Sequence, residues 1–89
     1  MPYIHPHDRI SIDEVLAKLQ SNRVAFSAGE LNYIVSSILG EHLRVVGTRY
    51  EKINELIGVL ECAKLELYRR IAAPYEDQKL HDHGDVYGQ

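Results

Sequence analysis

Three short motifs of the same kind constrain the fold of this chain. In each, Ser or Thr is followed three residues later by Glu, and apolar residues then recur at spacings of three and four. The motifs are Ser11 with Glu14, Ser27 with Glu30, and Thr48 with Glu51. In such a capping box the hydroxyl and the carboxylate satisfy free backbone N–H groups at the start of a helix. The sequence therefore predicts three helices, each beginning at one motif.

Pro and Gly residues indicate where these helices end. Gly47 is a natural C-terminal stop for the second helix. Pro74 is expected to end or kink the third helix and to start a short fourth one, which stops at Gly84. The expected elements are an N-terminal arm (1–10), helices over 11–21, 28–46, 49–73 and 74–83, and an extended tail (84–89).

The third predicted helix has two apolar sides. One stripe consists of Ile53, Leu56, Ile57, Leu60, Ala63, Leu67 and Ile71. A second face holds Gly58, Cys62, Leu65 and Ala72. One neighbouring helix cannot cover both sides, so this helix is either the centre of the domain or part of a subunit interface. We expect a single all-α domain that forms a homo-oligomer.

Composition narrows the class of protein. The 89 residues suffice for one domain, and 45% hydrophobic with 26% charged residues is typical of a globular chain. A net charge of -3 argues against a general nucleic-acid binder. Cys62 is the single cysteine, so no disulfide can form within the chain. Without a membrane-length apolar run or a signal peptide, we expect a soluble cytoplasmic protein.

Polar residues on the third helix and beyond it are the candidate ligand-binding groups. Arg can hold phosphate through two hydrogen bonds and Tyr can stack on a base, which would suit a small anionic ligand in a pocket between subunits. Alternatively, such residues pair internally, as Glu61 with Lys64 would. The candidate residues are Asn54, Glu61, Lys64, Tyr68, Arg69, Arg70, Tyr75, Asp85 and Tyr87.

Two His-x-His patterns raise the possibility of a metal site. They are His5-Pro6-His7 and His81-Asp82-His83, followed by Asp8 and Asp85 respectively. Imidazole and carboxylate groups suit zinc, but His-x-His alone is a weak signal. The chain has no phosphate-binding loop and no Ser-His-Asp arrangement. We therefore expect no metal, no cofactor and no enzymatic activity, with a metal-dependent enzyme using the terminal His and Asp residues as the alternative.

From Gly29 to Tyr87 the chain resembles an uncharacterised family of short proteins from phage and bacterial genomes. The matching runs are GELNYI, NELIGVLECAKLELYRR, PYEDQK and GDVY. The resemblance implies a phage setting, and hence the host cytoplasm, but it assigns no activity to any residue. Small helical phage proteins include inhibitors of host defence, some of which bind host proteins and others nucleotide signals.

These observations favour a non-enzymatic helical binding protein that captures an anionic nucleotide-like ligand or a host protein. A structural or assembly protein of a phage is a further alternative. Within the tail, we expect Val86 and Tyr87 to pack against the helices or a neighbouring subunit and to place Asp85 at a site.

Overall fold

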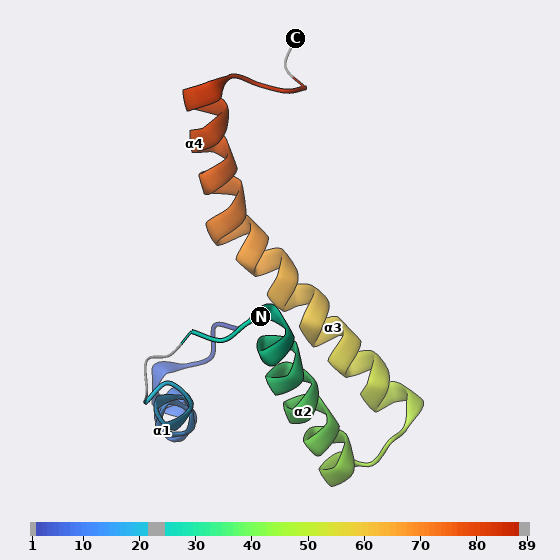
Figure 1. The fold of residues 1–89 in the computed structure, drawn as a ribbon. Coiled ribbons are helices and arrows are strands. Elements are labelled where there is room, and N and C mark those ends of the chain that lie inside the picture. The colour runs from blue at the N-terminus through green and yellow to red at the C-terminus, as the bar shows by residue number, and fades with distance from the viewer. Residues whose placement is uncertain (1, 22–24, 88–89) are drawn as a thin grey trace. The chain divides into compact units, whose positions relative to one another are not determined.

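A computed structural model describes residues 2–21 and 25–87, so Met1 and the end of the predicted tail lie outside the described residues. The described part is all-helical, as predicted. It forms two compact units, Pro2–Leu56 and a second that begins at Ile57. That they make up one domain stays a prediction. The elements are η1 (Pro6–Arg9), α1 (Ile10–Leu19), α2 (Ala28–Val46), α3 (Tyr50–Leu67), η2 (Tyr68–Ala72) and α4 (Ala73–His83) (Figure 1).

The first helix begins earlier than its predicted cap. The short 3-10 helix η1 leads directly into α1, whose N-cap position is Arg9 and carries no side-chain cap. The cap lies further upstream, where His5 Nδ1 accepts a hydrogen bond from the His7 N–H (3.1 Å). The prediction that Ser11 starts this helix is therefore wrong, because the chain is already helical when it reaches that residue.

Both predicted ends of α2 are confirmed. The Ser27 hydroxyl accepts from the Glu30 N–H (3.1 Å), and the Glu30 carboxylate accepts from the Ser27 N–H (2.8 Å). At the other end Gly47 adopts φ 96°, a conformation that side chains disfavour, and its N–H donates to the Leu43 carbonyl (2.8 Å). The helix spans Ala28–Val46, the range expected from the sequence.

The third helix begins one residue later than expected, at Tyr50. Its first backbone bond runs from the Ile53 N–H to the Arg49 carbonyl (2.9 Å). The Glu51 carboxylate, which belongs to the predicted Thr48 capping box, forms an ion pair with the Arg49 guanidinium (3.1 Å).

Pro74 does not end the long helix, contrary to one of our expectations. The helical run continues from α3 through a π-helical segment, η2, into α4, and Pro74 lies in the first turn of α4 (Figure 1). The Ala73 N–H bonds to the carbonyl of Tyr68, five residues back. A proline ring would clash with the carbonyl four residues before it, here that of Arg70, in a regular α-helix. The wider π turn accommodates the proline without breaking the helix.

The predicted end of α4 is confirmed. Gly84 follows His83 with φ 89°, and its N–H donates to the Leu80 carbonyl (2.8 Å). Glu76 lies in the first turn, while His81 and His83 lie in the last one. This distribution places negative charge near the positive end of the helix dipole and the basic side chains near its negative end.

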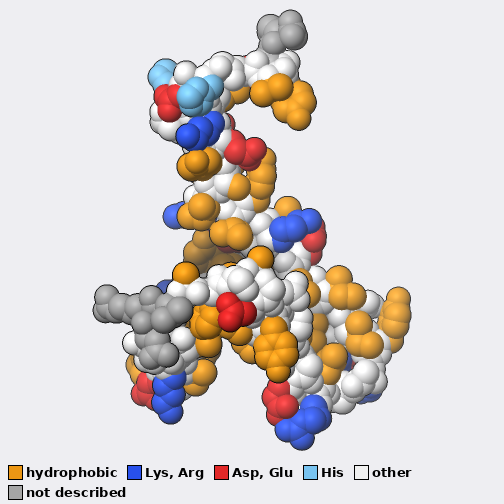
Figure 2. All heavy atoms as spheres, viewed as in Figure 1, with side chains coloured by type: hydrophobic (Ala, Val, Ile, Leu, Met, Phe, Trp, Pro, Cys, Tyr) orange, Lys and Arg blue, Asp and Glu red, His pale blue; other side chains and the backbone are white. Residues whose placement is uncertain are grey.

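No described residue is buried. Figure 2 shows hydrophobic side chains at the surface along the helices in view. Apolar residues that are partly buried include Ile34, Leu39, Leu43, Val46, Ile53 and Leu56, all in the first unit. From Ile57 to Ile71, the large apolar side chains are exposed. No described helix has both the length and the apolar character needed to span a membrane.

Candidate functional site

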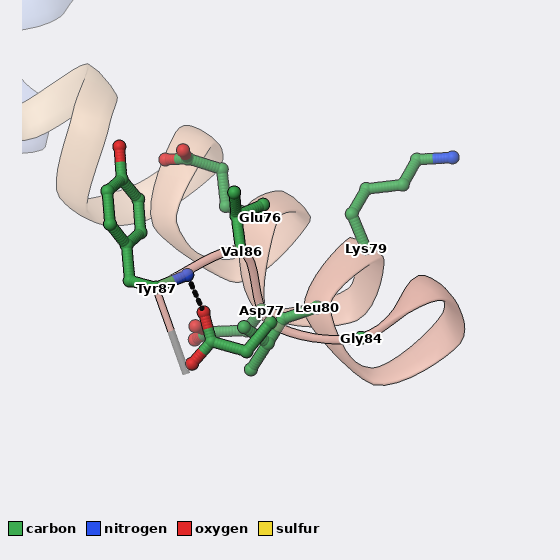
Figure 3. A pocket seen from close by; sticks show the side chains of 8 residues that line it. Glu76, Asp77, Lys79, Leu80, Gly84, Val86 and Tyr87 are labelled. Atoms are coloured by element: carbon green, nitrogen blue, oxygen red, sulfur yellow. Dashed lines mark hydrogen bonds between the residues drawn. The ribbon is translucent and has the colours of Figure 1, made fainter. Parts of the chain in front are cut away.

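The C-terminal tail and α4 line an open hollow of about 300 Å³. Its lining is Glu76, Asp77, Lys79, Leu80, Gly84, Asp85, Val86 and Tyr87. The chain turns after Gly84, and the Tyr87 ring and the Glu76 side chain extend to the same side of α4 (Figure 3). The hollow therefore combines apolar side chains with three carboxylates.

A local turn shapes the tail beside this hollow. The Tyr87 backbone N–H donates to the Asp85 carboxylate (2.8 Å), shown by the dashed line in Figure 3. Such an Asp-mediated turn needs only two residues of separation, so it forms from local sequence alone. The side chains of Val86 and Tyr87 are nevertheless 89% and 93% exposed. The prediction that they pack against the helices is wrong within one chain, because the turn keeps them in solvent.

Lys79 contributes little positive charge to the interior of the hollow. Its side chain points away from Tyr87 in Figure 3, and its ammonium lies 5.4 Å from the centre of the Tyr75 ring. A cation over an aromatic face is attracted by the ring quadrupole. The carboxylates of Glu76, Asp77 and Asp85 therefore set the electrostatic character of the hollow.

Tyr68 connects the π segment to the start of α4. Hydrogen bonding to the Glu76 carboxylate, followed by the negative charge of that group, raises the pKa of the Tyr68 hydroxyl. These residues are eight positions apart, which in a regular α-helix places them about 80° apart around the axis. One extra residue in the π turn brings them to nearly the same side. The π turn thus aligns Tyr68 with the residues around the hollow.

The cationic groups predicted to hold an anion are largely occupied by ion pairs. Lys64 pairs with Glu61 (3.1 Å) and Arg69 pairs with Glu66 (2.8 Å), each across one helical turn. The internal pairing of Glu61 with Lys64, the alternative from the sequence, is therefore confirmed. Arg70 is exposed on η2, and Asn54 is exposed on α3.

The structure brings together only part of the predicted site. Asp85 and Tyr87 meet at the hollow, and Tyr68 reaches its rim through Glu76. Tyr75 lies beside Lys79 rather than in the lining. Sequence reasoning assigned Glu76 and Asp77 to the helix dipole and so missed their place in the hollow. Asp77 and Asp85 are separated by about two helical turns, and Gly84 ends the helix between them. That spacing is the sequence signal that could have indicated that their carboxylates lie at one hollow.

A second hollow, of about 340 Å³, lies at the start of α2. Its lining residues are Phe26, Gly29, Glu30, Tyr33 and Ile34. The Glu30 carboxylate is held by the Ser27 N–H of the cap (2.8 Å). This hollow contains none of the residues that the sequence predicts as ligand-binding.

The two His-x-His patterns do not assemble a metal centre in the described residues. The His5 and His7 ring centres are 6.2 Å apart, and His5 uses Nδ1 to cap η1. Within residues 2–21 and 25–87, no three His, Cys, Asp or Glu side chains form a group that could hold a metal ion. The alternative of a metal-dependent enzyme gains no support from this geometry.

The chain belongs to a family described as a domain of unknown function (DUF6899), whose match covers residues 1–86. The match includes the first 28 residues, which the resemblance seen in the sequence did not cover. Among curated proteins and among solved structures, no match to the chain is found.

Proposed function

We propose that this protein is a non-enzymatic helical binding protein whose C-terminal hollow receives a basic segment of another protein. The observation that carries the proposal is the pair of exposed apolar side chains, Val86 and Tyr87, beside the carboxylates of Glu76, Asp77 and Asp85. Adjoining exposed apolar side chains rimmed by polar groups are typical of interaction surfaces. Carboxylates bind the guanidinium of Arg through paired, charge-assisted hydrogen bonds.

The charge of the hollow favours a protein segment over an anionic nucleotide-like ligand. Three carboxylates would repel phosphate groups, and Lys64 and Arg69 are already paired with glutamates. In the phage setting that the resemblance implies, the partner is a host protein, and inhibition of a host defence in the host cytoplasm is the expected outcome. We further propose that the protein works as a homo-oligomer.

Binding of a basic, apolar peptide to the isotopically labelled full chain tests the proposal. The probe is a short amidated peptide of Leu and Arg, and the measurement is the change in backbone NMR shifts. We expect shifts at Asp85, Val86 and Tyr87 and an affinity that falls with salt, because exposed charges are screened. Replacing Tyr87→Ala should weaken binding about fivefold or more, since it removes an aromatic contact at the hollow.

Tyr50→Ala is the matched control, because Tyr50 is 80% exposed and lies at the start of α3. It should change the affinity less than about twofold. A peptide of Leu and Asp, and ATP, serve as anionic probes. Shifts at residues 76–87 with ATP but not with the Leu-Arg peptide would contradict the proposal and favour the nucleotide-like ligand.

A further inference from the structure

Four places in the chain have Lys or Arg three residues after Glu. On a helix this spacing brings the two side chains to one side, where they can form an ion pair. Three of the four do so: Glu41 with Arg44, Glu61 with Lys64 (3.1 Å) and Glu66 with Arg69 (2.8 Å). The fourth pair, Glu76 with Lys79, lies in α4 within the described residues but forms no such contact. This exception lies in the lining of the C-terminal hollow.

Each of these two side chains has a different partner in the same part of the chain. The Lys79 ammonium lies 5.4 Å from the centre of the Tyr75 ring, which belongs to the preceding helical turn. The Glu76 carboxylate accepts a hydrogen bond from the Tyr68 hydroxyl. Figure 3 shows the Glu76 and Lys79 side chains extending in different directions from α4. Two tyrosines therefore hold apart a pair of opposite charges.

The position of Lys79 affects the charge of the hollow, because Lys79 lines it together with Glu76, Asp77 and Asp85. An ammonium paired with Glu76 would neutralise one of the three carboxylates and bring a positive charge close to the other two. With Lys79 over the Tyr75 ring, the three carboxylates keep their combined attraction for a cationic group of a partner.

We infer that Tyr75 is a positioning residue: it holds Lys79 away from Glu76 and so keeps the hollow selective for cationic groups, an inference that rests on the proposed function. The Tyr75 side chain is 63% exposed, so it contributes little to packing. At exposed sites a cation–π contact and an ion pair have comparable strengths, so loss of the ring lets Lys79 pair with an acid. Asp82, the other acid one turn from Lys79, already accepts a hydrogen bond from Gln78 (3.0 Å), which favours Glu76 as the new partner.

Contacts of the Lys79 side chain in the isotopically labelled full chain test this role without any partner. In the wild type we expect nuclear Overhauser effects between the Lys79 methylene next to the ammonium and the Tyr75 ring. Tyr75→Leu removes the ring but keeps an apolar side chain, and it should replace these signals by signals from Lys79 to Glu76. Tyr75→Phe should keep the wild-type contacts, because the attraction comes from the ring face.

The local electrostatic potential gives a second readout that needs no partner. The relaxation of amide protons is measured with a cationic and with an anionic nitroxide in solution. The cationic probe should relax the Val86 and Tyr87 amides more strongly, since carboxylates attract it. Tyr75→Leu should reduce this preference about twofold. Tyr50→Leu is the matched control and should not change it, because Tyr50 is 80% exposed and the residue one turn further on, Asn54, carries no charge.

The affinity for the Leu-Arg peptide measures the consequence for binding. Tyr75→Leu should weaken binding about threefold, which corresponds to one exposed ion pair. Lys79→Gln should change the wild-type affinity less than about 1.5-fold, because the ammonium already lies away from the carboxylates. In the Tyr75→Leu chain the same substitution should restore the affinity, since the loss acts through the lysine.

Several results would overturn the inference. They are unchanged Lys79 contacts in Tyr75→Leu, new contacts to Asp82 in place of Glu76, equal nitroxide results for Tyr75→Leu and Tyr50→Leu, and failure of Lys79→Gln to restore the affinity. A peptide that binds none of these chains would overturn the proposed function instead, because the contacts and the potential of the free chains still decide the role of Tyr75.

Discussion

At the scale of single residues, the pKa of the Tyr68 hydroxyl depends on the π turn in which this residue lies. Its hydroxyl is held by Glu76, and this contact raises its pKa. The neutral phenol is the favoured form in the folded chain. The stabilisation is present below the ordinary pKa of tyrosine, about 10, and is lost as pH rises through the higher pKa of the folded state.

The substitution Glu76→Gln should lower the pKa of Tyr68, because an amide carries no negative charge to oppose phenolate formation. The ultraviolet absorbance of phenolate during titration gives the pKa, once the curve of a Tyr68→Phe chain has been subtracted. Glu55→Gln alters a glutamate that pairs with Lys52 (3.5 Å), and it should leave the Tyr68 titration unchanged. An unchanged pKa in Glu76→Gln would rule out Glu76 as the cause.

At the scale of elements, the π turn before Pro74 determines which residues face the same side. A π turn contains one more residue per turn than the α-helix, so it rotates α4 by about 100° relative to an uninterrupted helix. This rotation places Glu76 beside Tyr68. The proline therefore sets the register of the C-terminal hollow relative to α3.

Replacing the proline tests this account of the element. Pro74→Ala supplies an N–H for the Arg70 carbonyl and removes the ring that would clash with it in a regular α-helix, so η2 should become α-helical. We expect the free energy of unfolding to rise by about 1 to 3 kcal/mol and the Tyr68 pKa to return toward its usual value. Backbone NMR shifts and chemical denaturation measure the two effects. Pro6→Ala, at the start of η1, should leave residues 68–76 unchanged, and a π pattern that persists in Pro74→Ala would refute the explanation.

The helices show which features could be predicted from the sequence and which could not. The Ser27 cap, the Gly47 stop and the Gly84 stop were predictable because each depends on a few neighbouring residues. The backbone conformation around Pro74 was not predictable. A helix that contains a proline can end, kink or widen by one turn, and no local pattern selects among these outcomes. Tyr68 and Asp85 were predicted as candidate site residues from their chemistry; Asp85 lines the hollow and Tyr68 contacts Glu76 in its lining. Glu76 was missed because its partners depend on the register after the π turn.

At the scale of the whole molecule, the absence of any buried residue in the described part bears on stability. A small domain derives most of its stability from apolar surface removed from water. The large apolar residues from Ile57 to Ile71 are exposed, as is Val45, at 75%, on α2. Association with another chain would remove such surface from water. Stability and association are therefore expected to be coupled.

Thermal unfolding should depend on protein concentration. If the folded state is dimeric, each tenfold rise in concentration adds about 1.4 kcal/mol to the free energy of unfolding per mole of dimer. The melting temperature from circular dichroism should then rise by several degrees between dilute and concentrated samples. Leu67→Glu places a charge at a side chain of α3 that is 64% exposed, and it should abolish this dependence. A wild-type melting temperature that stays constant across the same range would show that stability does not come from association.

The two locally fixed ends of α2 bear on the order in which the chain folds. The costly step in forming a helix is its first turn, and groups that satisfy the terminal N–H and C=O groups reduce that cost. Ser27 and Glu30 supply such groups at one end, and Gly47 does so at the other. Both ends form from neighbouring residues and need no contact with a distant part of the chain. The segment Ala28–Val46 is therefore suited to nucleate folding, with the long helix propagating after it.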